Sequence, residues 1–386
     1  MRSSTTIHKN IIYVLVFIFT LHLTPTVYIN SSFLSQFMTE SQVGLVYSVS
    51  SAVTVLFFLL IQKFLTRYGN HKTILAIILI ELITLLVLIF SVSTPLILTA
   101  FVIGLAMRSL AFFNIDIFLE NLTSDNETGG IRGIFMTSLN TAFVIGPLIA
   151  GVVLTDHDFW KIYAISSILL IPVIYILIRY MRNFNDPIYE KPQFIRTAKK
   201  IYDHCNFYGI FAAGFLLRFF FATMIIYTPI YLNQYIGFSI SEVTLIIGIA
   251  LIPFILLEAF LGWLADKIMG EKEILTTGFI IMAGATATMA FISIPNFWLW
   301  SAILFTTRIG ASMVEIMTET YLFKKINSGD INIMSFFRII RPIAYIVAPI
   351  FASVMLTVIE FKFLFLILGA IMLYGIRYSL AIRDTL

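Results

Sequence analysis

Ionisable side chains interrupt several long apolar runs of this chain, and their types suit anion binding and proton exchange. In the run 296–322, Arg308, Ser312, Glu315 and Glu319 recur at helical spacing. At 100° per residue, Arg308, Glu315 and Glu319 return to within about 20° of one helix face. Arginine presents a forked donor to a carboxylate or phosphate, whereas a glutamate can exchange a proton. Because ionisable groups in a membrane helix usually face protein or water, this stripe predicts part of a pathway for solutes or ions.

Comparable groups lie near the middle of three further apolar runs. Each is about 12 residues into its run, as Arg308 is, and therefore roughly 16–20 Å along a helix. Two more arginines lie three residues apart around Pro342. Together these residues predict a substrate-binding set for an anionic group: His22, Arg108, Arg218, Arg308, Arg338 and Arg341. Among the acids, Glu315 is the best candidate for proton coupling and Asp116 is a second.

Structural interpretations of these residues stay open. His22 could be a histidine bonded to a neighbouring helix, although a group that titrates near neutrality could also couple protons. Glu81, in a peripheral run, is interpreted as paired or interfacial. Arg218 is flanked by Phe219–Phe221, and a mid-helix arginine there is difficult to explain without a function.

Composition indicates which kind of helices position these groups. The 386 residues are 59% hydrophobic and only 12% charged, with a mean hydropathy of +0.96. Soluble proteins average about half apolar and a quarter charged residues, so this chain is predicted to be a multi-spanning membrane protein. Its net charge of +4 is therefore no argument for nucleic-acid binding. The single cysteine allows no intrachain disulfide.

No phosphate-binding loop, metal-spaced cluster or hydrolase-type catalytic arrangement stands out in the sequence. We therefore expect no cofactor, no metal and no enzymatic activity. Without a nucleotide-binding domain, the energy for any transport must come from a solute or ion gradient.

Twelve apolar stretches are long enough to cross a bilayer. The predicted spans are 11–32, 42–65, 73–92, 95–121, 132–154, 159–180, 206–231, 242–263, 274–293, 296–323, 332–356 and 361–380. The first is interpreted as a span and not a removed signal peptide, since no clear cleavage site follows it. One long polar connection divides the chain into a bundle at 1–181, a cytoplasmic linker at 182–205 and a bundle at 206–386. With both termini cytoplasmic, inner segments contain 18 Lys and Arg residues and outer loops only two.

The two halves also resemble each other. An offset of 200 relates segment 41–45 to 241–245, Arg108 to Arg308 and Lys72 to Lys272. The same offset relates two prolines that precede spans. We interpret this as a duplicated six-helix unit in parallel repeat, which places a binding site near the midplane between the repeats.

With this span pattern and repeat, the chain resembles the major facilitator superfamily of secondary transporters over nearly its whole length. The most specific stretch is 262–272, which is similar to the family's loop signature of Gly, Ala-Asp, a basic residue and Gly. The first-half loop keeps Arg67 and Gly69 but has Gln62 and Thr66 in place of the signature Gly and Asp. The resemblance implies a conformational latch, in which Asp266 meets the start of the fifth helix; the alternative is a set of solvated loop charges. The predicted gate and latch residues are Arg67, Gly69, Glu120, Arg132, Gly262, Asp266, Lys267, Gly270 and Glu319.

The fifth span partly resembles a helix motif that the family's antiporters often have, at Gly146, Pro147 and Gly151. The simpler interpretation, which we favour, is a proline kink with small residues for helix packing.

The sequence therefore predicts an all-α membrane protein whose twelve transmembrane helices form two pseudo-symmetric six-helix bundles. The resemblance implies alternating access by a plasma-membrane monomer with a small organic substrate, anionic if the arginines bind it, and with protons as coupling ion. A proton-linked multidrug exporter is the main alternative. A transporter-like receptor or scaffold without net transport is a third possibility, against which the latch motif argues.

Overall fold

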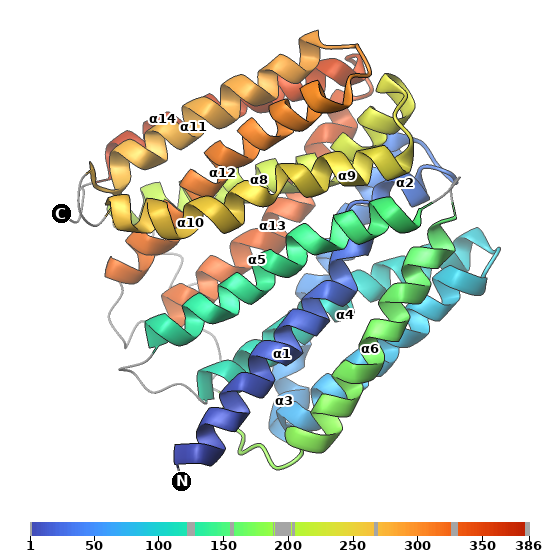
Figure 1. Ribbon diagram of the computed structural model, residues 1–386, viewed down its shortest axis with the longest axis vertical. Coiled ribbons are helices and arrows are strands. Elements are labelled where there is room, and N and C mark those ends of the chain that lie inside the picture. Colours follow the sequence, from blue (N-terminus) through green and yellow to red (C-terminus); the bar gives the residue numbers. More distant parts are fainter. Residues whose placement is uncertain are drawn as a thin grey trace. The chain divides into compact units, whose positions relative to one another are not determined.

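The computed structural model describes residues 2–121, 128–154, 158–187, 189, 202, 205–265, 269–325 and 331–382 (Figure 1). Within these ranges, no side-chain description extends to 2–9, 120–121, 128–134, 136, 205–206, 258–259, 262–263, 323–325, 331–336 and 338–339. The described backbone is almost entirely helical and contains no β-strand.

The first half contains six helices by the structure's own boundaries. They are α1 (Arg2–Val27), the short α2 (Asn30–Leu34), α3 (Glu40–Phe90), α4 (Thr94–Asn121), α5 (Thr128–Val153) and α6 (Phe159–Tyr180). The first predicted span ends early, at Val27, and α2 follows it. The long α3 contains the second and third predicted spans. Gly69, with φ 78° and ψ 165°, breaks the helix between them. Only glycine adopts that backbone conformation readily.

The second half repeats this order. Its helices are α8 (Cys205–Ile230), α9 (Ile240–Ala250), α10 (Ile252–Leu264), α11 (Glu271–Thr288), α12 (Phe297–Lys325), α13 (Ile331–Met355) and α14 (Phe361–Ala381). A π-helical turn, Tyr231–Ile236, extends α8, and a 3₁₀ turn, Met289–Phe291, extends α11. Together α9 and α10 form the eighth predicted span. They separate at Leu251 because Pro253 has no N–H for the continuing helical hydrogen bonds.

Splitting α3 at Gly69 and joining α9 to α10 gives twelve membrane-length segments in the described part of the chain. Nine stretches of the described chain are long and apolar enough to cross a membrane; one of them is the whole of α3, which supplies two of the twelve segments. Two shorter apolar stretches, Thr137–Val153 and Ile340–Met355, belong to α5 and α13. The prediction of twelve spanning helices is confirmed.

Contacts divide the chain into two compact units. Unit 1 comprises Met1–Phe37 and Val49–Lys191, and unit 2 comprises Met38–Ser48 and Pro192–Leu386. The main division falls within the linker expected at 182–205. The first part of α3 groups with unit 2, where Ser48 Oγ donates to the Ile346 carbonyl at 3.0 Å.

The helix pairings within the two halves match. In unit 1, α1 packs on α4, α5 and α6; in unit 2, α8 packs on α12, α13 and α14. These are the same partners, counted from the start of each repeat. Gly69 and Gly270 also share one backbone conformation, with φ 78° at both and ψ of 165° and 169°. The predicted pseudo-symmetry is therefore visible in packing and in loop geometry.

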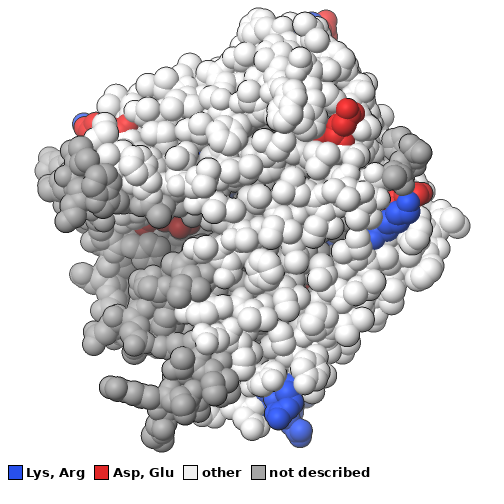
Figure 2. All heavy atoms as spheres, in the orientation of Figure 1, with Lys and Arg blue, Asp and Glu red and all other residues white. Residues whose placement is uncertain are grey.

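Glycines allow the closest helix approaches, as small residues commonly do in membrane bundles. A Cβ built on Gly146 of α5 would overlap the Thr24 side chain of α1. A Cβ on Gly310 of α12 would lie 2.6 Å from the Gly278 carbonyl oxygen of α11. The lipid-facing character of the surface is equally plain, since few charged side chains reach the described part of the face in Figure 2.

Candidate functional site

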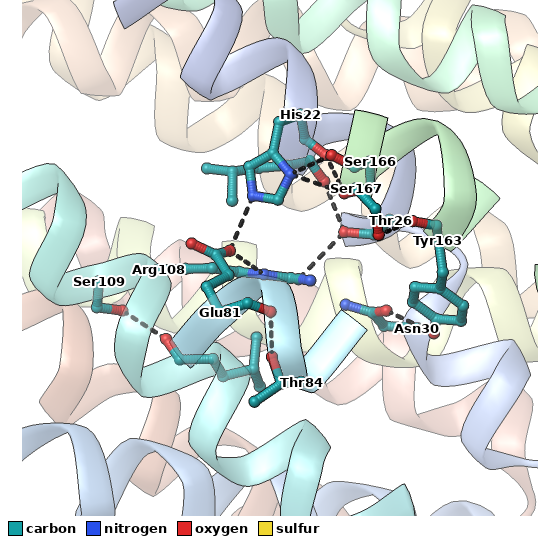
Figure 3. Close-up of polar contacts among 12 residues, drawn as sticks. His22, Thr26, Asn30, Glu81, Thr84, Arg108, Ser109, Tyr163, Ser166 and Ser167 are labelled. Atoms are coloured by element: carbon teal, nitrogen blue, oxygen red, sulfur yellow. Dashed lines mark hydrogen bonds and ion pairs between the residues drawn. The ribbon is translucent and has the colours of Figure 1, made fainter. Parts of the chain in front are cut away.

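Unit 1 contains a buried polar cluster formed by α1, α3, α4 and α6 (Figure 3). Glu81 Oε1 accepts from Arg108 Nε at 3.0 Å and lies 2.8 Å from His22 Nε2. Arg108 Nη1 donates to Thr26 Oγ1 at 3.1 Å, which in turn donates to the Leu23 carbonyl. The side chains of His22 and Glu81 are 0% exposed, and that of Arg108 is 10% exposed.

A second layer of bonds fixes the histidine from the other side. His22 Nδ1 lies 3.0 Å from the backbone carbonyl oxygen of Ser166 and 2.8 Å from its Oγ. The Ser166 hydroxyl donates to the His22 carbonyl at 2.6 Å. One turn away on the same helix, Tyr163 donates to Asn30 Oδ1 at 3.0 Å. Such a connected network satisfies most buried groups and holds the ring in one orientation.

Two of the six predicted substrate residues, His22 and Arg108, therefore meet at this cluster. Glu81, which joins them, was not among the predicted site residues. An acid within an apolar span is itself a functional indicator, but the sequence alone does not show that the third span faces the first and fourth.

Unit 2 contains a larger, partly open charged cluster. Arg218 Nη1 donates to Glu315 Oε1 at 2.6 Å, and its Nη2 lies 3.6 Å from Glu319 Oε1. The three side chains are 19%, 22% and 28% exposed in that order. The Arg308 guanidinium lies over the rings of Phe220 and Phe221, at 5.4 and 5.7 Å from their centroids. Arg218 of α8 thus contacts two residues of the face predicted on α12, Glu315 and Glu319. Arg308 is the third ionisable residue of that predicted face.

Three arginines, Arg218, Arg308 and Arg341, act on Tyr345 of α13. The Arg341 guanidinium is 5.9 Å from its ring centroid, and Arg218 and Arg308 act electrostatically on its phenol. Among the described side chains, this cluster therefore sets three guanidinium groups against the two carboxylates of Glu315 and Glu319. The surplus of positive charge is the property an anion site requires.

The loop between the two parts of α3 is closed by the linker. Asp186 Oδ1 accepts from the Asn70 backbone N–H at 2.7 Å and from the Tyr189 hydroxyl at 2.5 Å. This N–H opens the second part of α3, where unpaired amides and the helix dipole favour a carboxylate. The family signature places an aspartate in this loop; here Thr66 instead bonds the Gln62 carbonyl of its own helix. Asp186 supplies a carboxylate to the loop from outside it.

Burial raises the pKa of Tyr189, and the hydrogen bond to Asp186 raises it further. A buried, hydrogen-bonded phenol loses its proton less easily than an exposed one, because the phenolate would lie beside a carboxylate. The Asp186–Tyr189 contact is therefore stable at neutral pH.

The remaining predicted residues lie apart from both clusters or outside the description. Arg67 is exposed and lies over the Tyr68 ring at 5.2 Å, and Gly270 caps α11. Asp116 is half-buried two turns beyond Arg108 on α4. Gly146, Pro147 and Gly151 lie within α5, where Gly146 packs on α1. Outside the described residues or side chains lie Glu120, Arg132, Gly262, Asp266, Lys267 and Arg338.

No three His, Cys, Asp or Glu side chains of the described residues are grouped in a way that would hold a metal ion.

Comparisons with known proteins place this geometry in context. The sequence matches the Major Facilitator Superfamily over residues 11–330 and again over 210–383. A crystal structure of a mutant of the nucleoside transporter NupG is similar to 97% of this chain and 99% of its own, with 11% identity and a TM-score of 0.76. A bacterial homologue of the human lysosomal transporter Spinster, inward-facing and unoccupied, matches 99% of this chain and 94% of its own, with 13% identity and a TM-score of 0.71. Its occupied form matches with 12% identity and a TM-score of 0.69, over 97% of this chain and 92% of that one. No curated protein sequence matches the chain.

Proposed function

Because the chain belongs to the major facilitator superfamily and is a multi-pass membrane transporter, we propose that it moves a small organic anion by alternating access. Protons are the coupling ion in this proposal. The transporter acts as a monomer in the plasma membrane, with both termini in the cytoplasm.

The observation that supports an anionic substrate is the arginine surplus of unit 2. Arg218, Arg308 and Arg341 all lie around Tyr345. Guanidinium groups bind carboxylates and phosphates through paired hydrogen bonds, and aromatic faces stabilise those not so engaged. A neutral solute such as the nucleoside in NupG's name gains little from three cations. The charge therefore favours an anion over a nucleoside or a lipophilic cation.

Glu315 is the residue that links substrate to protons in this proposal. Its Oε1 accepts a hydrogen bond from Arg218 Nη1 at 2.6 Å, and a substrate anion would bind Arg218 in its place. Protonation of Glu315 removes its charge, weakens its hold on Arg218 and leaves the guanidinium available to the substrate. Both side chains are about one-fifth exposed, so water can deliver the proton. Asp116 of α4 is the second candidate for proton transfer.

The gate residues complete the proposal. Gly69 and Gly270 bend the equivalent loops, and Asp266 and Lys267 form a latch that closes at the cytoplasmic side. The remaining members of the gate set, Arg67, Glu120, Arg132 and Gly262, act with them. Glu319, whose Oε1 lies 3.6 Å from Arg218 Nη2, connects the gate to that arginine.

Flux measurements in proteoliposomes test the substrate class. An inward proton gradient should drive uptake of mono- and dicarboxylates or organophosphates, and not of nucleosides or lipophilic cations. Arg218→Gln should reduce anion uptake by about 10-fold or more, because a hydrogen bond to a charged group contributes about 1.5–3 kcal/mol. Arg179→Gln is the matched control, since that arginine is exposed on α6 beside Tyr180.

Uptake of a lipophilic cation that persists in Arg218→Gln would support a multidrug exporter instead. Tight ligand binding with no flux under any gradient would favour a receptor. Glu315→Gln should keep anion binding but lose its dependence on pH.

The orientation is tested with single cysteines. Cys205 is the only native cysteine, so a Cys205→Ser background accepts new cysteines at Lys9 or Lys362. An impermeant maleimide added to intact cells should label the second and not the first.

A further inference from the structure

Four tyrosine rings lie in a row at the end of unit 2 where α8 begins and α14 ends. Tyr202 of the linker lies edge-to-face against Tyr208 of α8, at a centroid distance of 6.0 Å. Tyr208 lies 5.9 Å from Tyr378 of α14, and Tyr378 lies 5.5 Å from Tyr374 one turn earlier. The linker, α8 and α14 thus share one aromatic surface, and we call these four residues the tyrosine patch.

The hydroxyl groups of the patch are connected as well. Tyr378 forms side-chain hydrogen bonds with Tyr208 and with Tyr374. Arg377 Nη1 donates to the Tyr374 hydroxyl at 2.8 Å, and its guanidinium lies 5.7 Å from the centroid of that ring. One cation and three phenols therefore form a continuous polar group.

This polar group has more hydrogens to donate than it uses. A guanidinium has five N–H donors, and a phenol has one O–H. The bonds among the hydroxyls use two phenol hydrogens, and the bond to Tyr374 uses one hydrogen of Arg377. The group itself thus leaves one phenol hydrogen and four guanidinium hydrogens without an acceptor. An anion with several oxygen atoms would supply what is missing.

The polar group lies on the surface that the bilayer covers. Tyr208 and Tyr374 are 44% and 50% exposed, and Arg377 is exposed too. Two leucines of α14 on either side of them, Leu373 and Leu380, are also exposed. Arg377 lies four residues, or about 6 Å, before the end of this membrane-length helix. That depth is the level of the lipid headgroups, where tyrosine rings are commonly found.

The acids at the start of α11 lie on the other side of α14. Glu271 and Glu273 are in the first turn of α11, and α11 contacts α14 where Thr276 Oγ1 lies 2.7 Å from Ser379 Oγ. At 100° per residue, Arg377 points about 160° away from Ser379. The positive charge of Arg377 is therefore directed toward lipid and away from these carboxylates.

We propose that the tyrosine patch and Arg377 bind the phosphate of an anionic phospholipid. The phosphate oxygens accept hydrogen bonds from the guanidinium and from a phenol, and the acyl chains lie along the exposed leucines of α14. The site requires only that the chain lies in a bilayer, so it does not depend on the proposed transport of anions.

Two features favour a lipid over a soluble anion. The patch is continuous with the apolar surface of α14, so a headgroup at Arg377 has acyl chains against the same helix. In the proposed orientation, the end of α14 also lies in the cytoplasmic leaflet, whose anionic lipids attract basic groups near the membrane surface.

The last helix of unit 1 has a simpler arrangement. Arg179 of α6 lies over the ring of the exposed Tyr180, at 5.6 Å from its centroid. In the described part of the chain, Arg179 has this single ring beside it and no hydrogen bond to a hydroxyl. Arg179 is therefore a matched control for an exposed arginine beside one tyrosine at the end of a spanning helix.

Native mass spectrometry of the full-length protein in detergent tests the site. The probes are phosphatidylglycerol, which is anionic, and phosphatidylcholine with the same acyl chains, which has no net charge. We expect one phosphatidylglycerol to stay bound at concentrations at which phosphatidylcholine does not. Arg377→Gln should weaken this binding by about 10-fold, because hydrogen bonds between a guanidinium and a phosphate are lost. Arg179→Gln should leave it unchanged.

Further substitutions separate charge, fork and hydroxyl. Arg377→Lys keeps the charge but not the forked donor, so it should bind at an intermediate level. Tyr208→Phe and Tyr378→Phe keep the rings and each remove one hydroxyl, and each should weaken binding by about 3-fold or more. Tyr175→Phe is their control, since Tyr175 is exposed on α6 outside the patch. Because Arg377 is exposed, its variants should keep the Tm of the wild type in lipid-free detergent.

Equal binding of the two lipids would overturn the site, as would phosphatidylglycerol binding that Arg377→Gln does not change. Inorganic phosphate and glycerol 3-phosphate distinguish a lipid from a soluble anion, and neither should displace phosphatidylglycerol at millimolar concentration. Displacement would show that the patch binds soluble anions and that the lipid assignment is wrong. No transport is measured, so failure of the proposed function would leave these outcomes unaffected.

Discussion

Replacing Gly69 by alanine should destabilise unit 1 through two separable effects. Gly69 has φ 78° and ψ 165°, a conformation that a residue with a Cβ adopts only under strain. A Cβ there would also overlap Asp186 Oδ2. Asp186 would have to move away from the Asn70 N–H, which it now bonds at 2.7 Å.

The magnitude follows from the two effects. Backbone strain of this kind costs about 1–3 kcal/mol. Loss of a carboxylate that caps a helix start costs about 0.5–2 kcal/mol. We therefore expect Gly69→Ala to reduce stability by about 3 kcal/mol, which corresponds to a fall in Tm of roughly 5 °C or more.

Thermal unfolding of purified protein in one detergent measures this change. Two other glycines provide matched controls. Gly237 also has positive φ, at 93°, with ψ 18° in the left-handed helical region, and a Cβ there would meet nothing within 4 Å; Gly237→Ala therefore reports the smaller backbone strain of that region without any overlap. Gly284 lies inside α11 with open space around it, and Gly284→Ala should be neutral or stabilising by about 0.5–1 kcal/mol.

A double-mutant cycle with Asp186→Ala isolates the capping effect. In that background the overlap is absent, so Gly69→Ala should cost less by about 0.5–2 kcal/mol. The reasoning is refuted if Gly69→Ala is no more harmful than Gly284→Ala. It is refuted in part if the cost is the same with and without Asp186, since the linker contact would then contribute nothing.

Three further substitutions test other contacts by the same measurement. Gly146→Val should cost about 1–3 kcal/mol, because the added atoms would overlap Thr24 at the α1–α5 crossing. Gly44→Val should cost a similar amount within unit 2, where a Cβ would overlap side chains from α8 and α13. Folding raises the pKa of Tyr189 above its ordinary value of about 10. The hydrogen bond to Asp186 therefore stabilises the fold at pH values below about 10, and this stabilisation is lost as the pH rises through the pKa of the folded protein. Tyr189→Phe should therefore lower Tm at neutral pH. The variant should also lack the part of the fall in Tm at alkaline pH that comes from deprotonation of Tyr189.

The number of helices was predictable because a bilayer imposes one length on every span. The break at Gly69 was also predictable in kind, since the loop signature contains a glycine where the chain must bend. The end of the first helix at Val27 was not predicted, because the apolar composition continues into α2 without a change in hydropathy.

The partners of the predicted charges were less accessible to sequence reasoning. Helical spacing placed Arg308, Glu315 and Glu319 on one face, but the arginine that contacts both acids is Arg218 of another helix. Glu81 seemed peripheral because spacing within one helix does not show which neighbours it faces. Asp186 was one of several linker charges, and only the folded chain shows that its carboxylate meets the start of the second part of α3.

The arginine that the two repeats share has different neighbours in each unit. Arg108 and Arg308 occupy equivalent places in α4 and α12, yet Arg108 bonds a buried acid and Arg308 lies over two aromatic rings. A carboxylate at 3.0 Å neutralises Arg108, so that arginine attracts a free anion weakly. The aromatic rings beside Arg308 carry no formal charge, and their faces attract a guanidinium. Ile281 is the position that corresponds to Glu81 in the repeat. Ile281→Glu should therefore bring a carboxylate toward Arg308 and reduce anion uptake, and unchanged uptake would contradict a role for Arg308 in anion binding.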